Sequence, residues 1–321
     1  MTLKKRKLFC IKYQMSNLIE IKKRIESITS TIKVTKVMQM IATAKIAKIK
    51  PMMGVVERYE NSANEILNLY LKNSKNTSKI DSFFEEDNKE KLEDKKHILF
   101  ILFASDKGTC GSINTNIFKF AIETIKECQS QGQEITIFPV GKRAVKWLKT
   151  NAEKFGVKTY EIDNFTADAE YCNSELIGKL TSKIIQEYQK GYFAEISILS
   201  HKYKNIITCN VYRKQLLPIQ KNKEQTSKDL QDVVKGNEFI NIDESENTAT
   251  AMIEFYIRTK LYNAYISNIA SIVSSRMNAM DNATKNGQEL IAELRIKYNK
   301  TRQANITAEL SDIVSGAEAL N

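Results

Sequence analysis

Apolar residues recur along the N-terminal part of the chain with the period of a coiled-coil seam. They fall at steps of three and four residues, at Leu18, Ile21, Ile25, Ile28 and Ile32. Such steps place one narrow stripe along a helix. The stripe then shifts to Met38, Ile41, Ala44 or Lys45, and Ile49, and helical spacing continues to Tyr70. The pattern predicts a long N-terminal helix over residues 15–72.

Pro51 lies inside this helical pattern, and Gly54 follows it. Proline removes a backbone hydrogen bond and clashes with the preceding turn of a helix. We therefore expect a bend or a break in the helix within one turn before Pro51.

A second seam occupies the C-terminal part of the chain. Its positions are Tyr262, Ile266, Ile269, Val273, Met277, Met280, Thr284, Gly287, Ile291, Leu294 and Tyr298. The stretch contains no proline, so the pattern predicts a second long helix within residues 244–321. Apolar spacing continues at Ile306, Leu310, Ile313 and Ala317, beyond the reach of the predicted N-terminal helix. An apolar helix tip without a partner needs a socket in another protein.

Residues 97–219 alternate between short apolar runs and helical patterns. Strands are predicted at His97–Phe103, Glu134–Val140, near Val157–Ile162, Ala194–Ser200 and Ile206–Arg213; helices are predicted at Ile113–Gln129, Lys142–Thr150 and Ser174–Lys190. This alternation is typical of a parallel, doubly wound (Rossmann-like) α/β domain. The fold class predicted for the whole chain is α/β. It combines this central domain with a long antiparallel coiled coil of the N- and C-terminal helices, because neither helix can bury its stripe alone.

Three segments stand outside this architecture. Residues 73–96 and 220–243 are polar and weakly periodic, which is typical of linkers or insertions. Residues 1–14 form a basic stretch before Met15, and we interpret them as a disordered tail or an overlong start.

The net charge of +11 is concentrated at one end of the chain. Residues 1–50 hold thirteen Lys and Arg against two acids, so the remainder is neutral overall. An acidic partner for this segment, or a solvated face with no partner, both fit the pattern. Aromatic residues are absent between Leu18 and Lys50, which disfavours binding of single-stranded nucleic acid.

The residues that commonly carry chemistry are sparse. Five cysteines are scattered without CxxC spacing, which favours free thiols in a reducing compartment over disulfides or a zinc site. Two histidines lack a partner pattern, so we predict no metal and no cofactor. The longest fully apolar run, Ile98–Ala104, has seven residues, too few for the roughly twenty of a membrane span.

One glycine-containing turn, Ala104–Asn116, joins the first predicted strand to the first predicted helix. Turns at this position can hold phosphates at a helix N-terminus. Gly108 and Gly111 do not make a GxGxxG pattern, however. A structural turn and a nucleotide-binding turn therefore both stay open, with the structural interpretation favoured.

Several blocks, in order along the chain, resemble the gamma subunit of the rotary ATP synthase. They are Leu18–Ile28, Ile32–Lys45, Ser105–Asn114, Arg276–Asn286, Tyr298–Thr307 and Ile313–Ala317. The resemblance implies a non-catalytic rotor shaft that turns inside a ring of alternating alpha and beta subunits and couples proton flow to ATP synthesis. It further implies contacts with the epsilon subunit and the c-subunit ring, no nucleic acid, and membrane association only through the complex. The implied location is the cytoplasmic face of a bacterial inner membrane, rather than the mitochondrial matrix face.

The resemblance also assigns roles to individual residues. Lys36 and Met38 match a Lys-x-Met contact with an acidic loop of beta; Arg302, Gln303 and Thr307 match residues that meet a second beta loop; Arg276 matches a position that helps couple rotation to catalysis. Pro51 with Gly54, the 1–14 tail and the 73–96 insertion depart from the family pattern, and no role is implied for them. Two rival hypotheses are a nucleotide-binding α/β enzyme and a basic coiled-coil nucleic-acid-binding protein.

Overall fold

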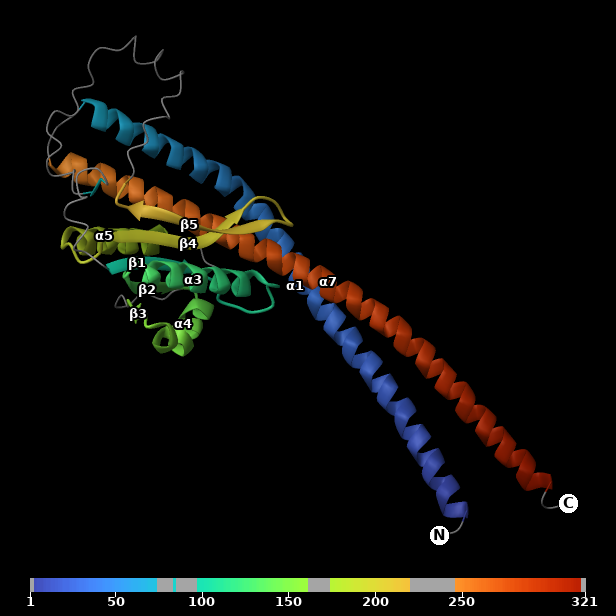
Figure 1. Cartoon of the computed structure of the whole chain (residues 1–321). Coiled ribbons are helices and arrows are strands. Elements are labelled where there is room, and N and C mark those ends of the chain that lie inside the picture. The colour runs from blue at the N-terminus through green and yellow to red at the C-terminus, as the bar shows by residue number, and fades with distance from the viewer. Residues whose placement is uncertain (1–2, 74–82, 85–96, 161–173, 220–245, 319–321) are drawn as a thin grey trace. The chain divides into compact units, whose positions relative to one another are not determined.

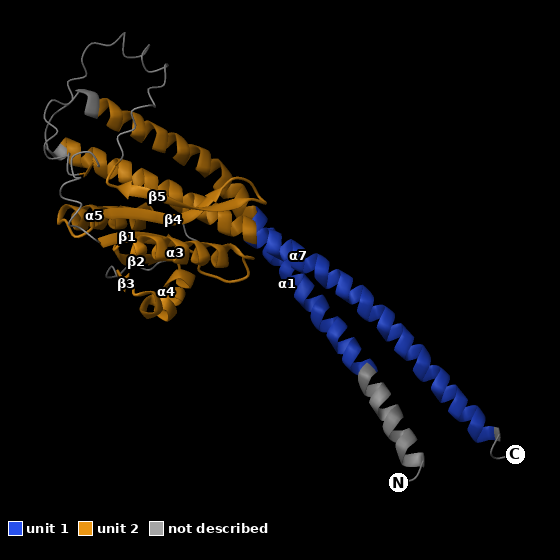
Figure 2. Cartoon of the chain, viewed as in Figure 1, with its two compact units in different colours: residues 1–43, 276–321 blue, residues 44–275 orange. Residues whose placement is uncertain are grey.

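The computed structural model describes residues 3–73, 83–84, 97–160, 174–219 and 246–318 (Figure 1). The chain divides into two compact units (Figure 2). Unit 1 combines residues up to 43 with residues from 276 onward, and unit 2 spans residues 44–275.

Two long helices contribute to both units. Helix α1 spans Leu3–Asn73 and helix α7 spans Glu246–Glu318. The predicted terminal helices are thus confirmed, and α1 begins at Leu3 rather than at residue 15, so residues 3–14 are helical. The two predicted linkers, apart from residue 73, which ends α1, and residues 83–84, lie outside the described residues.

Of the bend or break expected before Pro51, the break does not occur, because helix α1 continues without interruption through Pro51. Proline in a helix interior costs about 3 kcal/mol, mostly from a lost hydrogen bond and a steric clash. Buried side chains on both sides of Pro51 hold the helix in place, namely Ile46, Val56, Ala63, Leu67 and Tyr70. Pro51 has no N–H to donate to the carbonyl of Ala47, but Ala47 is exposed, so water can donate to this carbonyl instead. Packing and solvation therefore offset the cost of the proline.

Unit 1 is an antiparallel pair made by the N-terminal half of α1 and the C-terminal half of α7. On α1 the seam runs through Leu18, Ile21, Ile25, Ile28, Ile32, Thr35 and Ala42, all buried or half-buried. Ile41, which the sequence pattern placed in the seam, is 54% exposed. The seam keeps its heptad spacing through Thr35 and Ala42, two residues that a count of strongly apolar positions passes over.

A buried pair of hydroxyl groups joins the two helices near the middle of unit 1. The Oγ1 atoms of Thr35 and Thr284 lie 2.7 Å apart. Thr35 donates its own hydrogen to the carbonyl of Ile32 at 3.0 Å, so Thr284 is the donor between the two threonines. One polar pair inside an apolar seam favours a single register, because any slip leaves both hydroxyls buried without partners.

A further contact between the helices fixes the same register. Gln39 Nε2 of α1 donates to Asp281 Oδ1 of α7 at 3.0 Å, and within α7 Lys285 Nζ lies 2.7 Å from Asp281 Oδ2. The hydrogen bond from Lys285, with a smaller effect from Gln39, holds the pKa of Asp281 below its ordinary value. One helical turn beyond Thr284, Gly287 faces Ile32, where a Cβ would come within 2.8 Å of Ile32 Cγ1. Only glycine allows this close approach.

Unit 2 is built on a five-stranded sheet in the order β3-β2-β1-β4-β5. The strands are β1 (His97–Phe103), β2 (Glu134–Val140), β3 (Lys158–Thr159), β4 (Glu195–Tyr203) and β5 (Cys209–Leu217); the helices between them are α3 (Ile113–Ser130), α4 (Lys142–Phe155) and α5 (Ser174–Gln189). Strands β1 to β4 are parallel, which confirms the doubly wound prediction for these strands.

Strand β5 differs from the prediction, because it pairs antiparallel with β4 and makes the sheet mixed. No helix separates β4 from β5, and a connection this short cannot cross over the sheet. The connection is a tight turn in which Asn205 Oδ1 accepts hydrogen bonds from the N–H groups of Ile207 and Thr208, at 2.9 and 2.7 Å.

Alternate residues of β1 serve the two faces of the sheet. Ile98, Phe100 and Leu102 belong to the core cluster formed with α3 and α4. The ring of Phe103 packs against the ring of Tyr265 of α7, with 6.1 Å between the two ring centroids, so α7 covers the opposite face. Helix α5 packs on α7, since Ser182 Oγ donates to Glu254 at 3.0 Å. Helices therefore cover both faces of the buried sheet, with α3 and α4 on one face and α7 on the other (Figure 1).

A buried ionic cluster joins α1, β5 and α7 within unit 2. Glu60 of α1 accepts a hydrogen bond from Lys214 Nζ of β5 and another from Asn263 Nδ2 of α7. Lys260 of α7 lies over the ring of Tyr256, 4.1 Å from its centroid. Burial, and then the nearby charge of Lys214, lower the pKa of Lys260 to about 8, against an opposing effect of Glu60. Removal of Glu60 would leave these cations without their carboxylate.

The two ring nitrogens of buried His201 both face oxygen acceptors. Nε2 lies 3.1 Å from the carbonyl oxygen of Ile113, and Nδ1 lies 3.1 Å from Asn268 Oδ1. In this amide orientation Asn268 Nδ2 has no hydrogen-bond partner. Turning the amide lets Nδ2 donate to Nδ1, while Nε2–H donates to Ile113. His201 is thus held neutral, and burial lowers its pKa below its ordinary value.

The close contact at Gly287 predicts that Gly287→Ala weakens unit 1. Crowding against Ile32 costs about 1–3 kcal/mol, and the better helix propensity of alanine recovers up to about 1 kcal/mol. We expect a net loss of about 1 kcal/mol in urea unfolding followed by circular dichroism.

The matched control is Gly316→Ala, since no atom lies within 4 Å of a Cβ at that position. This control should be neutral or slightly stabilising. If both variants unfold alike, the close approach at Gly287 is not a constraint on the coil.

Neutral His201 predicts that acid destabilises unit 2. The folded pKa is depressed, so the stabilisation is fully present above the ordinary value of 6.5 and is lost as pH falls below it, by at most about 1.4 kcal/mol per pH unit. His201→Gln cannot titrate and should show a shallower loss of unfolding free energy between pH 7 and pH 5. Parallel curves for both proteins would show that other groups control the pH response.

Candidate functional site

The residues assigned by resemblance all belong to unit 1. Lys36 is exposed on α1, and Met38 is half-buried beside the seam. Thr35, which precedes Lys36, is buried in the hydroxyl pair with Thr284. The rigid seam therefore fixes the direction in which the Lys36 side chain leaves the helix.

The basic side chains near Lys36 are available to a partner. Lys22, Lys23, Arg24, Lys33 and Lys36 are all exposed on α1. Within the part of the chain that the structure describes, none of these five makes an ion pair. The charge is thus not neutralised inside unit 1, and it creates a positive potential along this face of the helix.

Apolar side chains share this surface with the lysines. Val34, Val37, Met40 and Ile41 are 58%, 54%, 65% and 54% exposed. Met40 follows Lys36 by one helical turn, and the apolar residues form a continuous band beside the lysines. We call these four residues with Lys33 and Lys36 the α1 patch. Exposed apolar groups rimmed by charge mark a protein contact.

Sequence reasoning found the lysines of this patch but missed its apolar part. The signal was present, because these apolar residues fall outside the heptad positions once Thr35 and Ala42 are counted in the seam. An apolar residue off the seam of a coiled coil is exposed unless something else covers it.

A second group of predicted residues lies on α7. Arg302 and Gln303 are exposed, and exposed Thr307 donates its hydroxyl to the carbonyl of Gln303 at 2.9 Å. Thr307 is thus oriented along its own helix. Arg302 and Gln303 point into solvent, as expected for residues that meet another chain.

The two groups are far apart along unit 1. Thr284, opposite Thr35, and Arg302 are separated by 18 positions on α7, or roughly 27 Å at 1.5 Å per residue. They form two contact regions rather than one site. Arg276 differs from both groups, since it is 7% exposed and belongs to the interior.

The apolar end of α7 is exposed, although α1 begins at Leu3 and is longer than the sequence pattern predicted. Ile306, Leu310, Ile313 and Val314 are 47%, 57%, 68% and 54% exposed, and Ala317 is exposed as well. Their spacing places them on one face of the helix. This stripe is a third surface suited to an apolar partner.

The glycine turn of unit 2 uses its polar groups within the fold. Asn114 Oδ1 accepts the N–H of Ser105 at 3.1 Å, and Ser105 Oγ donates to the carbonyl of Lys107 at 2.7 Å. Cys110 is 2% exposed, and its carbonyl accepts from Ser275 Oγ of α7 at 2.6 Å. These contacts fill and fix the turn, which favours the structural interpretation over phosphate binding.

Groups that could hold a metal do not gather in the described part of the chain. Among residues 3–73, 83–84, 97–160, 174–219 and 246–318, no three His, Cys, Asp or Glu side chains lie where they could hold an ion. None of the described helices has a stretch both long and apolar enough to cross a bilayer. The surfaces of unit 1 are the main candidates for function, because their exposed charged and apolar side chains suit contacts with other proteins.

Sequence comparison finds relatives along the full length of the chain. The profile of the ATP synthase family matches residues 17–320. The ATP synthase gamma chain of Pelagibacter ubique (strain HTCC1062) is 34% identical over 312 residues, with 95% of this chain and 100% of the relative covered. The gamma chains of Sulfurovum sp. (strain NBC37-1) and Rickettsia typhi (strain ATCC VR-144 / Wilmington) are 30% and 31% identical, with the same coverage.

Structural comparison agrees on the fold. A chain of the Euglena gracilis mitochondrial ATP synthase, solved with OSCP, F1 and the c-ring, matches with a TM-score of 0.60 at 17% identity, covering 95% of each chain. A rotor chain of the same enzyme matches with a TM-score of 0.56 at 16% identity, covering 91% of this chain and 99% of that one.

Proposed function

Because the chain belongs to the ATP synthase gamma-chain family, whose members are non-catalytic rotor subunits, we propose that unit 1 drives the beta subunits through the α1 patch and the α7 residues near Arg302. The observation that carries this proposal is the surface charge of α1. The five exposed cations from Lys22 to Lys36 have no acidic partner among the described residues, and exposed apolar side chains lie beside Lys33 and Lys36.

The partner that fits the α1 patch is an acidic loop with an apolar side. Lys33 and Lys36 would attract the carboxylates of such a loop, while Val37, Met40 and Ile41 would bury apolar area against it. The beta subunit is the partner that the family relation supports. Met38, half-buried beside the seam, would mark the edge of the contact.

The α7 residues suit a second, more polar contact. Arg302 offers a planar, permanently charged group, and Gln303 offers both a donor and an acceptor. Roughly 27 Å separates this group from Thr284, so a beta subunit that touches both needs two different loops. The apolar stripe of Ile306 to Val314 would then turn inside an apolar collar made by the alpha and beta subunits.

Torque transfer in this proposal needs an asymmetric and stiff shaft. A single shaft cannot present one face to three equivalent beta subunits at once, so each beta subunit is held in a different conformation and turning the shaft cycles all three. Thr35, Thr284 and Gly287 would supply resistance to slipping between the two helices. Arg276 acts in this proposal from inside the shaft, as a coupling residue rather than as a surface contact.

The remaining partners follow from the same family relation. We place unit 2 against the epsilon subunit and the c-subunit ring, and we place the complex at the cytoplasmic face of a bacterial inner membrane. The bacterial sources of the gamma chains named above support this location. Nothing in this proposal requires a cofactor or a nucleic acid.

The charge of the α1 patch predicts that Lys36→Glu uncouples function from assembly. Exposed substitutions change stability by about 0.5 kcal/mol or less, so the subunit should fold and assemble. Reversed charge would repel an acidic loop at each passing beta subunit, and ATP synthesis should fall severalfold. The measurement compares the amount of assembled complex with ATP synthesis driven by a proton gradient.

The matched control is Glu289→Lys, the opposite swap on an exposed position of α7 in unit 1. It should change synthesis less than Lys36→Glu does. Equal and negligible effects would mean that the lysines form a solvated face only.

A rotor without catalytic groups predicts that the purified chain alone hydrolyses no ATP. The glycine turn is closed by its own hydrogen bonds, so nucleotide affinity of the isolated chain should be absent as well. Turnover in partner-free protein would instead support the α/β enzyme. Salt-sensitive retention of DNA would support the nucleic-acid-binding protein.

A further inference from the structure

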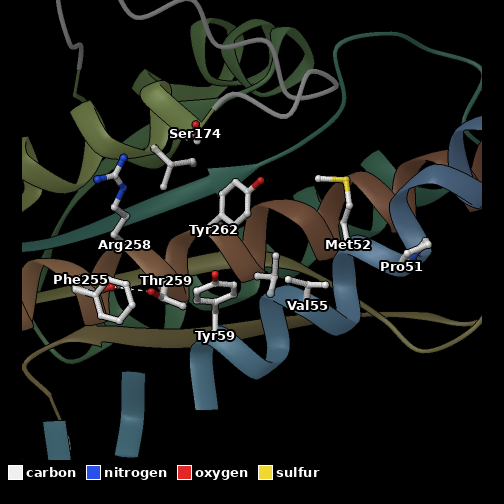
Figure 3. A pocket seen from close by; sticks show the side chains of 11 residues that line it. Pro51, Met52, Val55, Tyr59, Ser174, Phe255, Arg258, Thr259 and Tyr262 are labelled. Atoms are coloured by element: carbon white, nitrogen blue, oxygen red, sulfur yellow. Dashed lines mark hydrogen bonds between the residues drawn. The ribbon is translucent and has the colours of Figure 1, made fainter. Parts of the chain in front are cut away.

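Unit 2 contains a cavity of about 460 Å³ that is separate from the contact surfaces described for unit 1 (Figure 3). Its walls come from three helices: α1 around Pro51, Val55 and Tyr59, α7 around Phe255 and Tyr262, and the start of α5. Cavities of about 300–1,000 Å³ with apolar walls are typical small-molecule sites.

The walls are apolar and partly open to solvent. Met52, Val55, Tyr59 and Phe255 are 38%, 41%, 58% and 42% exposed. The hydroxyl of Thr259, one of the few polar groups in the lining, donates to the carbonyl of Phe255 at 2.7 Å and is therefore already satisfied. Most of the surface that a ligand would touch offers no hydrogen bond.

One charged side chain stands in this apolar lining. Arg258 of α7 extends its guanidinium over Gly178 of α5, where a Cβ would come within 3.0 Å of Nη2. Glycine at 178 thus leaves room for the guanidinium, and Figure 3 shows Arg258 at the wall near Ser174. Among the described residues Arg258 makes no hydrogen bond and no ion pair.

The acid nearest along the helix does not neutralise Arg258. Glu254 lies one turn before it and accepts the hydroxyl of Ser182 at 3.0 Å, but it makes no ion pair with Arg258. A guanidinium presents parallel N–H donors that match a carboxylate. Apolar walls with a single unpaired cation are therefore complementary to a molecule with an apolar body and one carboxylate.

We propose that this cavity binds a medium-chain fatty acid, with its carboxylate on Arg258 and its chain along Val55, Tyr59 and Phe255. We favour a small carboxylic acid over a partner helix, because the apolar lining presents a single unpaired cation, which matches one carboxylate. The ligand would contact α1, α5 and α7 together, so it would stabilise the packing of unit 2 by mass action.

The test uses the full chain and decanoate as the probe. With methyl-labelled methionine, NMR should show a saturable shift of Met52, assigned by Met52→Leu, while Met280 in unit 1 should not move. Calorimetry should show that Arg258→Gln weakens decanoate binding at least tenfold. Decanol, which lacks the carboxylate, should bind the wild-type chain about as weakly as decanoate binds that variant.

Two further variants separate the cavity from general surface binding. Arg295→Gln removes another exposed arginine of α7, in unit 1, and should leave decanoate affinity unchanged. Val55→Trp fills the cavity from an exposed position and should abolish binding. Absence of a saturable Met52 shift, or equal binding to wild type and Arg258→Gln, overturns the proposal. An apolar peptide with a glutamate that shifts Met52 where decanoate does not would overturn it too, and would make the cavity a protein contact.

Discussion

The register between α1 and α7 in unit 1 is the constraint on which the candidate contact surfaces depend. Thr35 and Thr284 meet at 2.7 Å in an otherwise apolar seam, and Gly287 lets the backbone of α7 approach Ile32. A slip of one heptad would bury unpaired hydroxyls and press a larger side chain against Ile32. The direction of Lys36 is thus set by its buried neighbour Thr35. A surface that pushes on another protein needs this kind of support, because a loosely held side chain yields before it transmits force.

In unit 2 the same two helices pack against a sheet, and polar groups are buried between them. Glu60 accepts hydrogen bonds from Lys214 and Asn263. The two ring nitrogens of His201 are hydrogen-bonded to Asn268 and to the carbonyl of Ile113. Buried ionic contacts add little net stability, since desolvation offsets most of the attraction, but breaking one is costly. They specify which helix lies beside which strand. Glu60 and His201 are therefore engaged in the fold and serve position rather than chemistry.

Much of this architecture could be predicted from the sequence, because hydrophobic period is a strong signal over long elements. Both terminal helices, β1 and β2 follow from it, and the positions of the predicted C-terminal seam are buried or half-buried through Met280 and Thr284. The seam of α1 was harder, because Thr35 and Ala42 are buried without being strongly apolar. A local pattern does not report a hydroxyl pair 249 positions apart.

The break expected at Pro51 and the parallel direction expected for β5 were wrong for related reasons. A local rule for proline cannot include the buried contacts of Val56, Leu67 and Tyr70, which keep α1 continuous. The direction of β5 depends on a tight turn whose key contact is the side chain of Asn205. The α1 patch combines charged side chains with apolar ones, and the two kinds act over different distances. Its lysines attract over about 8–10 Å at physiological salt, whereas its apolar side chains act only in contact and are not weakened by salt. A moving interface needs both kinds of interaction. The charge attracts an acidic loop toward the shaft from a distance, and the apolar side chains form the contact through which force is transmitted once the two chains touch.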